Sequence, residues 1–78
     1  MTYYRLCDMT RDEEVLVKEI NVQGSMKRRL VDIGLIEGTR VKCVGKSPLG
    51  DPLAYLIRGA VIAIREETGK DVTVERVD

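Results

Sequence analysis

Short alternating runs of apolar and polar residues, broken by glycine, proline and charged residues, make up most of the chain. Alternation of period two is typical of β-strands that bury one face. The strands expected from this pattern cover residues 15–20, 40–44, 53–57, 60–64 and 72–77. Only Arg58 and Gly59 separate the two most apolar runs, so these runs predict a tight hairpin. Because both faces of that hairpin are apolar, we expect it at the centre of the sheet.

One segment has the period of a helix instead. Met26, Leu30 and Ile33 form a single apolar stripe at helical spacing. Ser25 precedes the stripe as a candidate N-cap, and Gly34 follows it where a helix commonly ends in the left-handed conformation. We therefore expect one short helix that begins at Ser25 and ends at Ile33.

The segments outside these elements carry weaker signals. Tyr3, Leu6 and Met9 are apolar at helical spacing, which predicts a turn or a helical start. Residues 65–71 predict a polar connection. From the phases of the elements, the side chains expected in the core include Met26, Leu30, Val41, Ile62 and Val74.

The order of the elements predicts a mainly β fold. About five short strands with one short helix favour a small closed barrel, since closure removes exposed sheet edges. The length of 78 residues indicates a single domain over residues 1–78. The apolar runs are too short for a membrane helix, and the first residues do not have the pattern of a signal peptide, so we expect a cytoplasmic protein.

Charge and composition argue against several classes of function. Thirteen basic residues balance thirteen acidic ones, whereas a nucleic-acid binder usually carries net positive charge. The chain has no histidine, so its serines and threonines lack the commonest general base. We therefore expect no enzymatic activity, no cofactor and no nucleic-acid partner, and a role in binding another protein.

Metal ligands are also sparse. Cys7 and Cys43 lie far apart in the sequence and predict two small buried apolar side chains rather than a zinc site. The carboxylates that gather near the start are Asp8, Asp12, Glu13 and Glu14. Such a cluster without a fixed scaffold binds divalent ions weakly. We expect no iron or zinc to be held by a single chain.

A proline-bracketed loop is the most suggestive candidate for a partner-binding site. Leu49 lies between Pro48 and Pro52, and these prolines restrict the backbone before binding. An apolar tip held in this way docks at little cost in entropy, although the same residues also suit a rigid turn into the next strand. Leu35 and Ile36 are apolar in a second loop, where they either cap the barrel or lie exposed for the partner.

The segments 30–41, 48–52 and 59–65, in this order and spacing, resemble the ferrous iron transport protein A family, FeoA. Each segment alone is a weak signal, and their combination is specific. The resemblance extends over residues 15–77 and implies a barrel of the Src-homology-3 (SH3) type. Gly69 departs from an alanine that is common in the family, which predicts a looser turn there.

The resemblance implies an accessory or regulatory role in bacterial ferrous iron uptake. The chain would then bind the cytoplasmic side of the membrane transporter FeoB, whose N-terminal part is a GTP-binding domain. At family level the resemblance also implies iron homeostasis and transition-metal binding. Two alternatives stay open: a generic SH3-like adaptor, and a stand-alone relative of the C-terminal domain of metal-dependent transcriptional repressors. Fold alone does not settle function, so neither alternative is excluded. A weak homo-oligomer also stays open.

Overall fold

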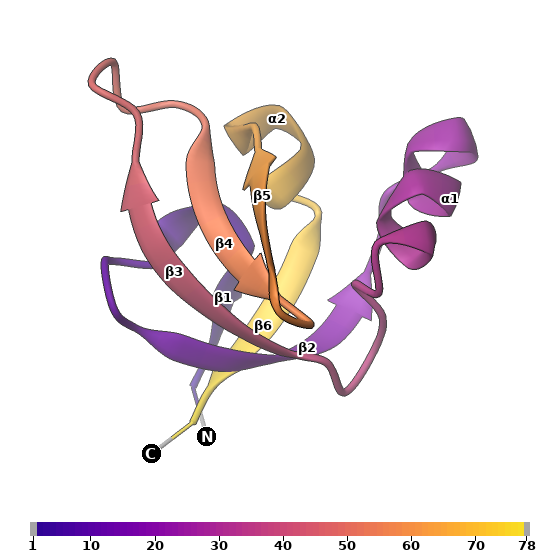
Figure 1. Cartoon of the computed structure of the whole chain (residues 1–78). Coiled ribbons are helices and arrows are strands. Elements are labelled where there is room, and N and C mark those ends of the chain that lie inside the picture. The colour runs from indigo at the N-terminus through magenta and orange to yellow at the C-terminus, as the bar shows by residue number, and fades with distance from the viewer. Residues whose placement is uncertain (1, 78) are drawn as a thin grey trace.

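Six antiparallel strands form one strongly curved sheet in the computed structural model, which describes residues 2–77 (Figure 1). The strand order is β1-β6-β2-β3-β4-β5. The elements are β1 (Tyr3–Arg5), the 3-10 helix η1 (Leu6–Asp8), β2 (Glu14–Ile20), α1 (Gly24–Asp32), β3 (Arg40–Lys46), β4 (Leu53–Ile57), β5 (Ala60–Ile64), α2 (Glu66–Gly69) and β6 (Val72–Arg76). The prediction of a mainly β, SH3-like fold with one small helix after the first predicted strand is confirmed.

The predicted hairpin is present, but its place in the sheet was predicted wrongly. Arg58 and Gly59 have φ values of 49° and 85°, so both turn residues lie in the left-handed region, as a two-residue type I′ turn requires. Within residues 2–77, β5 pairs only with β4 and forms one edge of the sheet, while β1 forms the other. The sheet is therefore open, and the expected full closure into a barrel does not occur.

Helix α1 lies beside the sheet (Figure 1). Only part of its apolar stripe is buried. Leu30 is buried, whereas Met26 is 36% exposed, so its predicted burial was wrong. The predicted N-cap at Ser25 was also wrong, because Gln23 caps the helix without a side-chain hydrogen bond.

The end of α1 was predicted correctly. Gly34 has a φ of 93°, and its N–H donates to the Val31 carbonyl at 2.9 Å. The N–H of Leu35 donates to the Leu30 carbonyl at 2.8 Å, which completes a Schellman motif. This motif turns the chain back so that Leu35 enters the core.

The core fills the concave side of the sheet. It comprises Leu6, Met9, Val15, Val17, Val22, Leu30, Leu35, Val41, Cys43, Tyr55, Ile57, Ile64, Val72 and Val74. The predicted burial of Leu30, Val41 and Val74 is confirmed. Ile62 is only partly buried, because it lies on the edge strand and borders a groove described below. Cys43 is buried and Cys7 is half-buried, and both are free thiols.

Two short elements were not expected from the sequence. β1 pairs with β6, and α2 occupies the connection that was predicted to be polar and irregular. Gly69, at the end of α2, is buried against Cys7. A Cβ atom at Gly69 would lie 3.1 Å from the Cβ of Cys7, which is tighter than ordinary packing. The turn is therefore close-packed rather than loose.

A hydrogen-bonded carboxylate joins the start of the chain to its end. Glu13 accepts hydrogen bonds from the Tyr4 hydroxyl and from the Thr10 backbone N–H, and Arg76 lies 3.0 Å away. Burial alone would raise the pKa of Glu13, but these hydrogen bonds and the guanidinium of Arg76 together lower it. Burial and the Glu13 carboxylate raise the pKa of Tyr4 to about 12. The ionised form of Glu13 therefore stabilises the fold.

Replacing Glu13 with glutamine should lower the free energy of unfolding near neutral pH by about 1–2 kcal/mol, because hydrogen bonds to a charged group are lost. The folded pKa lies below the unfolded value of 4.5, so the contribution is complete above that value and disappears as the pH falls through the folded pKa. Urea unfolding at about pH 7 and about pH 3 should therefore show a difference that shrinks in acid. An equal difference at both pH values would contradict this assignment.

Candidate functional site

The loop between β3 and β4 presents an apolar tip on a closed backbone. Leu49 is 95% exposed, more than any other large apolar side chain among residues 2–77. The backbone N–H of Ser47 donates to the Pro52 carbonyl at 3.1 Å, and the N–H of Gly50 donates to the Ser47 carbonyl at 2.8 Å. The Ser47 hydroxyl also donates to the Asp51 carbonyl at 2.8 Å. These bonds close the loop on itself, and it projects from the body of the molecule (Figure 1).

The carboxylate of Asp51 fastens this loop to the rest of the fold. One oxygen accepts a hydrogen bond at 2.9 Å from the backbone N–H of Glu66, at the start of α2. The other lies 3.8 Å from the guanidinium of Arg65. Asp51 therefore satisfies a free donor at the start of a helix that belongs to a distant part of the sequence. A loop held in this way loses little conformational entropy when its tip is covered.

The residues predicted to bind a partner do not all lie together. Pro48 and Leu49 are exposed and Pro52 is half-buried in the loop, whereas Ile36 is 39% exposed and precedes β3, at the opposite end of that strand. Leu35 is fully buried, so the expectation that it is exposed for a partner was wrong and the alternative, that it caps the core, is correct. The Schellman motif explains this, because its residue after the glycine packs back onto the helix.

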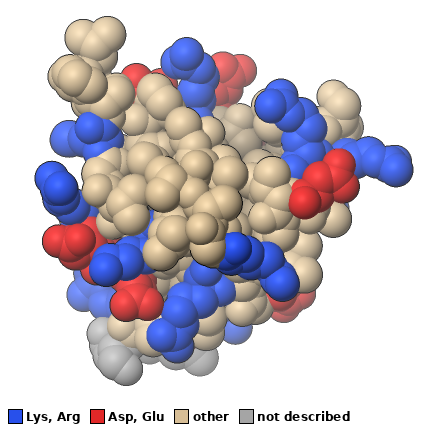
Figure 2. Space-filling view, in the orientation of Figure 1, with Lys and Arg blue, Asp and Glu red and all other residues tan. Residues whose placement is uncertain are grey.

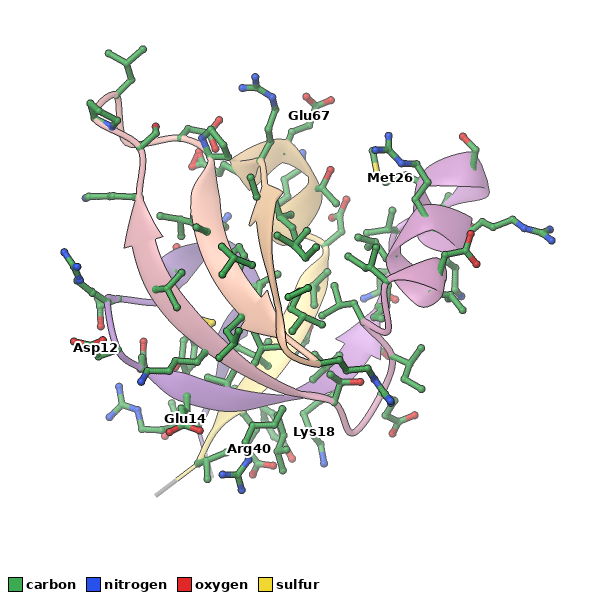
Figure 3. The ribbon with its side chains drawn as sticks, in the orientation of Figure 1. Asp12, Glu14, Lys18, Met26, Arg40 and Glu67 are labelled. Carbon is green, nitrogen blue, oxygen red and sulfur yellow. The ribbon has the colours of Figure 1, made fainter. Side chains whose placement is uncertain are left out.

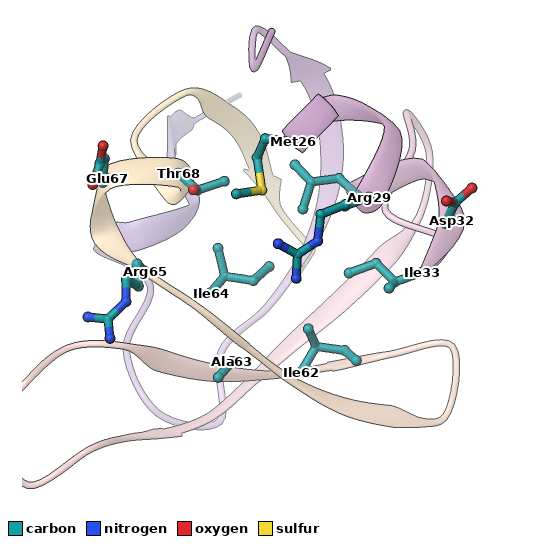
Figure 4. Close-up of a pocket in the computed structure, with 11 residues that line it drawn as sticks. Met26, Arg29, Asp32, Ile33, Ile62, Ala63, Ile64, Arg65, Glu67 and Thr68 are labelled. Atoms are coloured by element: carbon teal, nitrogen blue, oxygen red, sulfur yellow. The ribbon is translucent and has the colours of Figure 1, made fainter. Parts of the chain in front are cut away.

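A groove of about 620 Å³ lies between α1 on one side and β5 with α2 on the other (Figure 4). Its lining residues are Met26, Arg29, Leu30, Asp32, Ile33, Ile62, Ala63, Ile64, Arg65, Glu67 and Thr68. This groove was not predicted from the sequence. The sequence did contain one signal for it, the five apolar residues in succession that form β5. In the structure this strand lies at the edge of the sheet, where such a run leaves apolar side chains beside the groove.

The outer face of β4 and β5 is apolar and is bordered by basic residues. Leu56 is 37% exposed and Val61 is 64% exposed, and the two face each other across the strands. Figure 2 shows an uncharged area over this part of the molecule, with more Lys and Arg than Asp and Glu around it. Exposed apolar area of this kind on a small protein is typical of a surface that contacts another molecule.

Asp8, Glu13 and Glu14, three of the four carboxylates near the start of the chain, lie in separate ion pairs rather than in one cluster. Asp8 lies 2.8 Å from Arg5, and Glu14 lies 3.5 Å from Arg40, where Figure 3 shows the two side chains next to each other. Burial and the nearby Asp8 carboxylate raise the pKa of the Cys7 thiol. Within residues 2–77, no group of three or more Cys, Asp or Glu side chains is arranged to hold a metal ion.

No helix in the described part of the chain is long and apolar enough to span a membrane.

Comparison with known proteins places the chain in a family. The FeoA domain model matches residues 4–76. A fusion protein of Porphyromonas gingivalis, which joins Fe(2+) transport protein A to the Fe(2+) transporter FeoB, is 23% identical over 73 residues; the match covers 94% of this chain and 9% of the fusion protein.

Solved structures agree with that match. A FeoA-like protein from Clostridium acetobutylicum has a TM-score of 0.88 at 32% identity, covering all of this chain and 92% of the other. The zinc complex of Stenotrophomonas maltophilia FeoA, a prokaryotic SH3 domain protein, has a TM-score of 0.75 at 25% identity, covering 91% of this chain and 88% of the other.

A manganese-dependent transcriptional repressor has a TM-score of 0.85 at 14% identity, covering 96% of this chain and 42% of the repressor. At that identity the likeness shows the fold alone. The family match, by contrast, extends over nearly the whole described chain. The chain therefore belongs to the FeoA domain family, which is linked to ferrous iron transport.

Proposed function

We propose that this chain is a cytoplasmic accessory protein of ferrous iron uptake that acts by binding the FeoB transporter. The relative from Porphyromonas gingivalis supports this, because it carries the two proteins in one polypeptide. Tethering raises the effective concentration of two modules for each other, so fusion is typical of partners that associate. The function is regulatory rather than catalytic, and the chain contributes a binding surface.

The observation that carries the proposal is the exposure of Leu49 on a loop fixed by hydrogen bonds. An isolated apolar side chain in solvent does not stabilise the free protein. When the partner covers it, the buried area contributes to affinity and little ordering is needed. Leu49, bracketed by Pro48 and Pro52, is therefore the proposed centre of the contact with FeoB.

Replacing Leu49 with aspartate should weaken binding to purified FeoB about 30-fold or more, because the loss of a central contact costs about 2 kcal/mol. The melting temperature should stay unchanged, since the side chain packs against nothing in the free protein. Titration calorimetry or surface plasmon resonance with detergent-solubilised FeoB measures the affinity, and thermal denaturation measures the stability.

A matched control is Val31→Asp, which places the same charge on an exposed aliphatic position of α1 outside the groove. Its affinity for FeoB should stay within about twofold of the unmodified chain. If Leu49→Asp binds FeoB as tightly as the control does, the loop is only a turn and the proposed contact is wrong.

A further inference from the structure

Strand β5 is an edge strand without the usual protection. Edge strands in soluble proteins commonly carry a charged residue, a proline or a bulge that discourages pairing with another chain. β1, the opposite edge, is only three residues long and ends in Arg5. β5 reads Ala-Val-Ile-Ala-Ile and pairs with β4 without a register shift. Its free edge is therefore regular, apolar and able to accept a further strand.

The register of the hairpin identifies which backbone groups are free. In a two-residue hairpin the pair next to the turn, Ile57 and Ala60, is hydrogen-bonded, and bonded and non-bonded pairs then alternate. Val61 and Ala63 therefore direct their N–H and C=O groups away from β4. Within residues 2–77, no backbone hydrogen bond outside the β4 ladder involves β5. Two N–H donors and two C=O acceptors, from Val61 and Ala63, therefore face outward along the free edge of β5.

The groove beside β5 has walls that suit an added strand. Figure 4 shows Ile62 and Ile64 pointing into it from β5, with Met26 and Ile33 on the side of α1. The Nε of Arg58 donates to the Gly34 carbonyl at 3.3 Å, which ties the β4–β5 turn to the end of the helix. An extended segment that lies between β5 and α1 would cover these apolar side chains with every second one of its own residues, because those residues share one face of the added strand.

Arginines surround this edge. Arg58 precedes β5, Arg65 follows it, and Arg29 reaches into the groove from α1 (Figure 4). Arg29 has no ion-pair partner among the described residues, and the pair of Arg65 with Asp51 is loose at 3.8 Å. Two acidic residues also line the groove, Asp32 and Glu67, and Figure 4 shows both carboxylates directed away from its centre. An occupant with acidic side chains would complement this charge.

We infer that the free edge of β5 is a docking site for an extended acidic and apolar segment of a partner protein, which adds to the sheet as a further strand between β5 and α1. Backbone hydrogen bonds to Val61 and Ala63 supply the register, the groove accepts apolar side chains, and the arginines select acidic ones. The inference does not depend on the Leu49 loop, so it stands or falls separately from the proposed function.

The probe is a seven-residue peptide, acetylated and amidated at its ends, in which aspartate and valine alternate. Titration into the isotope-labelled chain should shift the amide resonances of β5 and α1 in NMR spectra. Hydrogen exchange of the Val61 and Ala63 amides should slow on binding, because both become donors to the peptide. A peptide with lysine in place of aspartate should bind at least about tenfold more weakly, since it meets like charge.

Arg29→Glu should weaken binding of the acidic peptide about tenfold, whereas Arg28→Glu should change it by no more than about twofold. Both arginines are exposed on α1, but only Arg29 lines the groove. Comparing the two variants therefore separates the effect of charge in the groove from the effect of the net charge of the protein. Equal effects of the two reversals would overturn the proposed selection of acidic segments.

Two further peptides test the backbone pairing without altering the protein. One carries N-methyl groups on the valines and the other on the aspartates, so each lacks the donors along one edge of the strand. Strand addition requires that one of them fails to bind. Binding that survives both methylations overturns the inference. Concentration-dependent dimerisation that protects the amides of Val61 and Ala63 without peptide would overturn it in favour of a second copy as the occupant.

Discussion

Replacing Tyr55 with alanine should remove a large part of the free energy that holds the chain folded. Tyr55 is the largest fully buried side chain, and it projects from β4 into the middle of the core. Truncation of a buried aromatic side chain costs about 3–5 kcal/mol. A domain of this size has a total stability of about 4–12 kcal/mol by the usual figure per residue. Far-ultraviolet circular dichroism and urea unfolding measure the loss.

Tyr55→Phe separates the ring from the hydroxyl. The hydroxyl donates to the Leu6 carbonyl at 3.2 Å, and burial raises the pKa of Tyr55, so this donor keeps its proton at neutral pH. The Met9 N–H also donates to the Leu6 carbonyl, at 3.2 Å, so that acceptor keeps a partner when the Tyr55 hydroxyl is removed. The substitution should therefore cost only about 1 kcal/mol, the net contribution of one hydrogen bond. If the alanine and phenylalanine variants are destabilised equally, the ring does not have the central packing role described above.

The hairpin was predictable to the residue because all its signals are local. Two apolar runs of strand length flank a two-residue turn whose glycine accepts a positive φ, and β4 and β5 have the predicted bounds. β1 was missed for the opposite reason. Its three residues form a strand through pairing with β6, seventy residues away, and the local pattern of Tyr3, Leu6 and Met9 favoured a helical period instead.

The errors over Met26, Ile62 and the place of the hairpin share one cause. Apolar periodicity predicts that a face will be covered, but it does not identify what covers it. The pattern was interpreted as burial within a closed barrel. In the open sheet, α1 lies beside β5, and the two elements border a groove. Met26 and Ile62, which the pattern had marked as core, line this groove instead.

The loop was predictable, and its attachment was not. Proline and glycine between two strands indicate a turn, and the expectation of an exposed tip agrees with the 95% exposure of Leu49. The hydrogen bond from Glu66 to Asp51 joins residues fifteen positions apart, and neither residue belongs to a recognisable pair in the sequence. The rigidity that supports the proposed function therefore became visible only in the fold.

Leu35 and Ile36 are adjacent in the sequence and should behave in opposite ways. Leu35→Ala should lower the free energy of unfolding by about 2–4 kcal/mol, since truncating a fully buried leucine leaves a cavity in the core. Ile36→Ala should cost less than about 1 kcal/mol, because Ile36 is 39% exposed. Urea unfolding of the two variants measures both values.

Binding to FeoB distinguishes this structural role from a contact role. The folded fraction of Leu35→Ala should bind with unchanged affinity, because its side chain is not accessible to a partner. Leu49→Asp should show the reverse, with normal stability and weakened binding, because Leu49 is accessible and packs against nothing in the free chain. A Leu35→Ala variant that stays fully stable but loses FeoB would mean that α1 and its following loop rearrange on binding. In that case Leu35 would return to the contact surface.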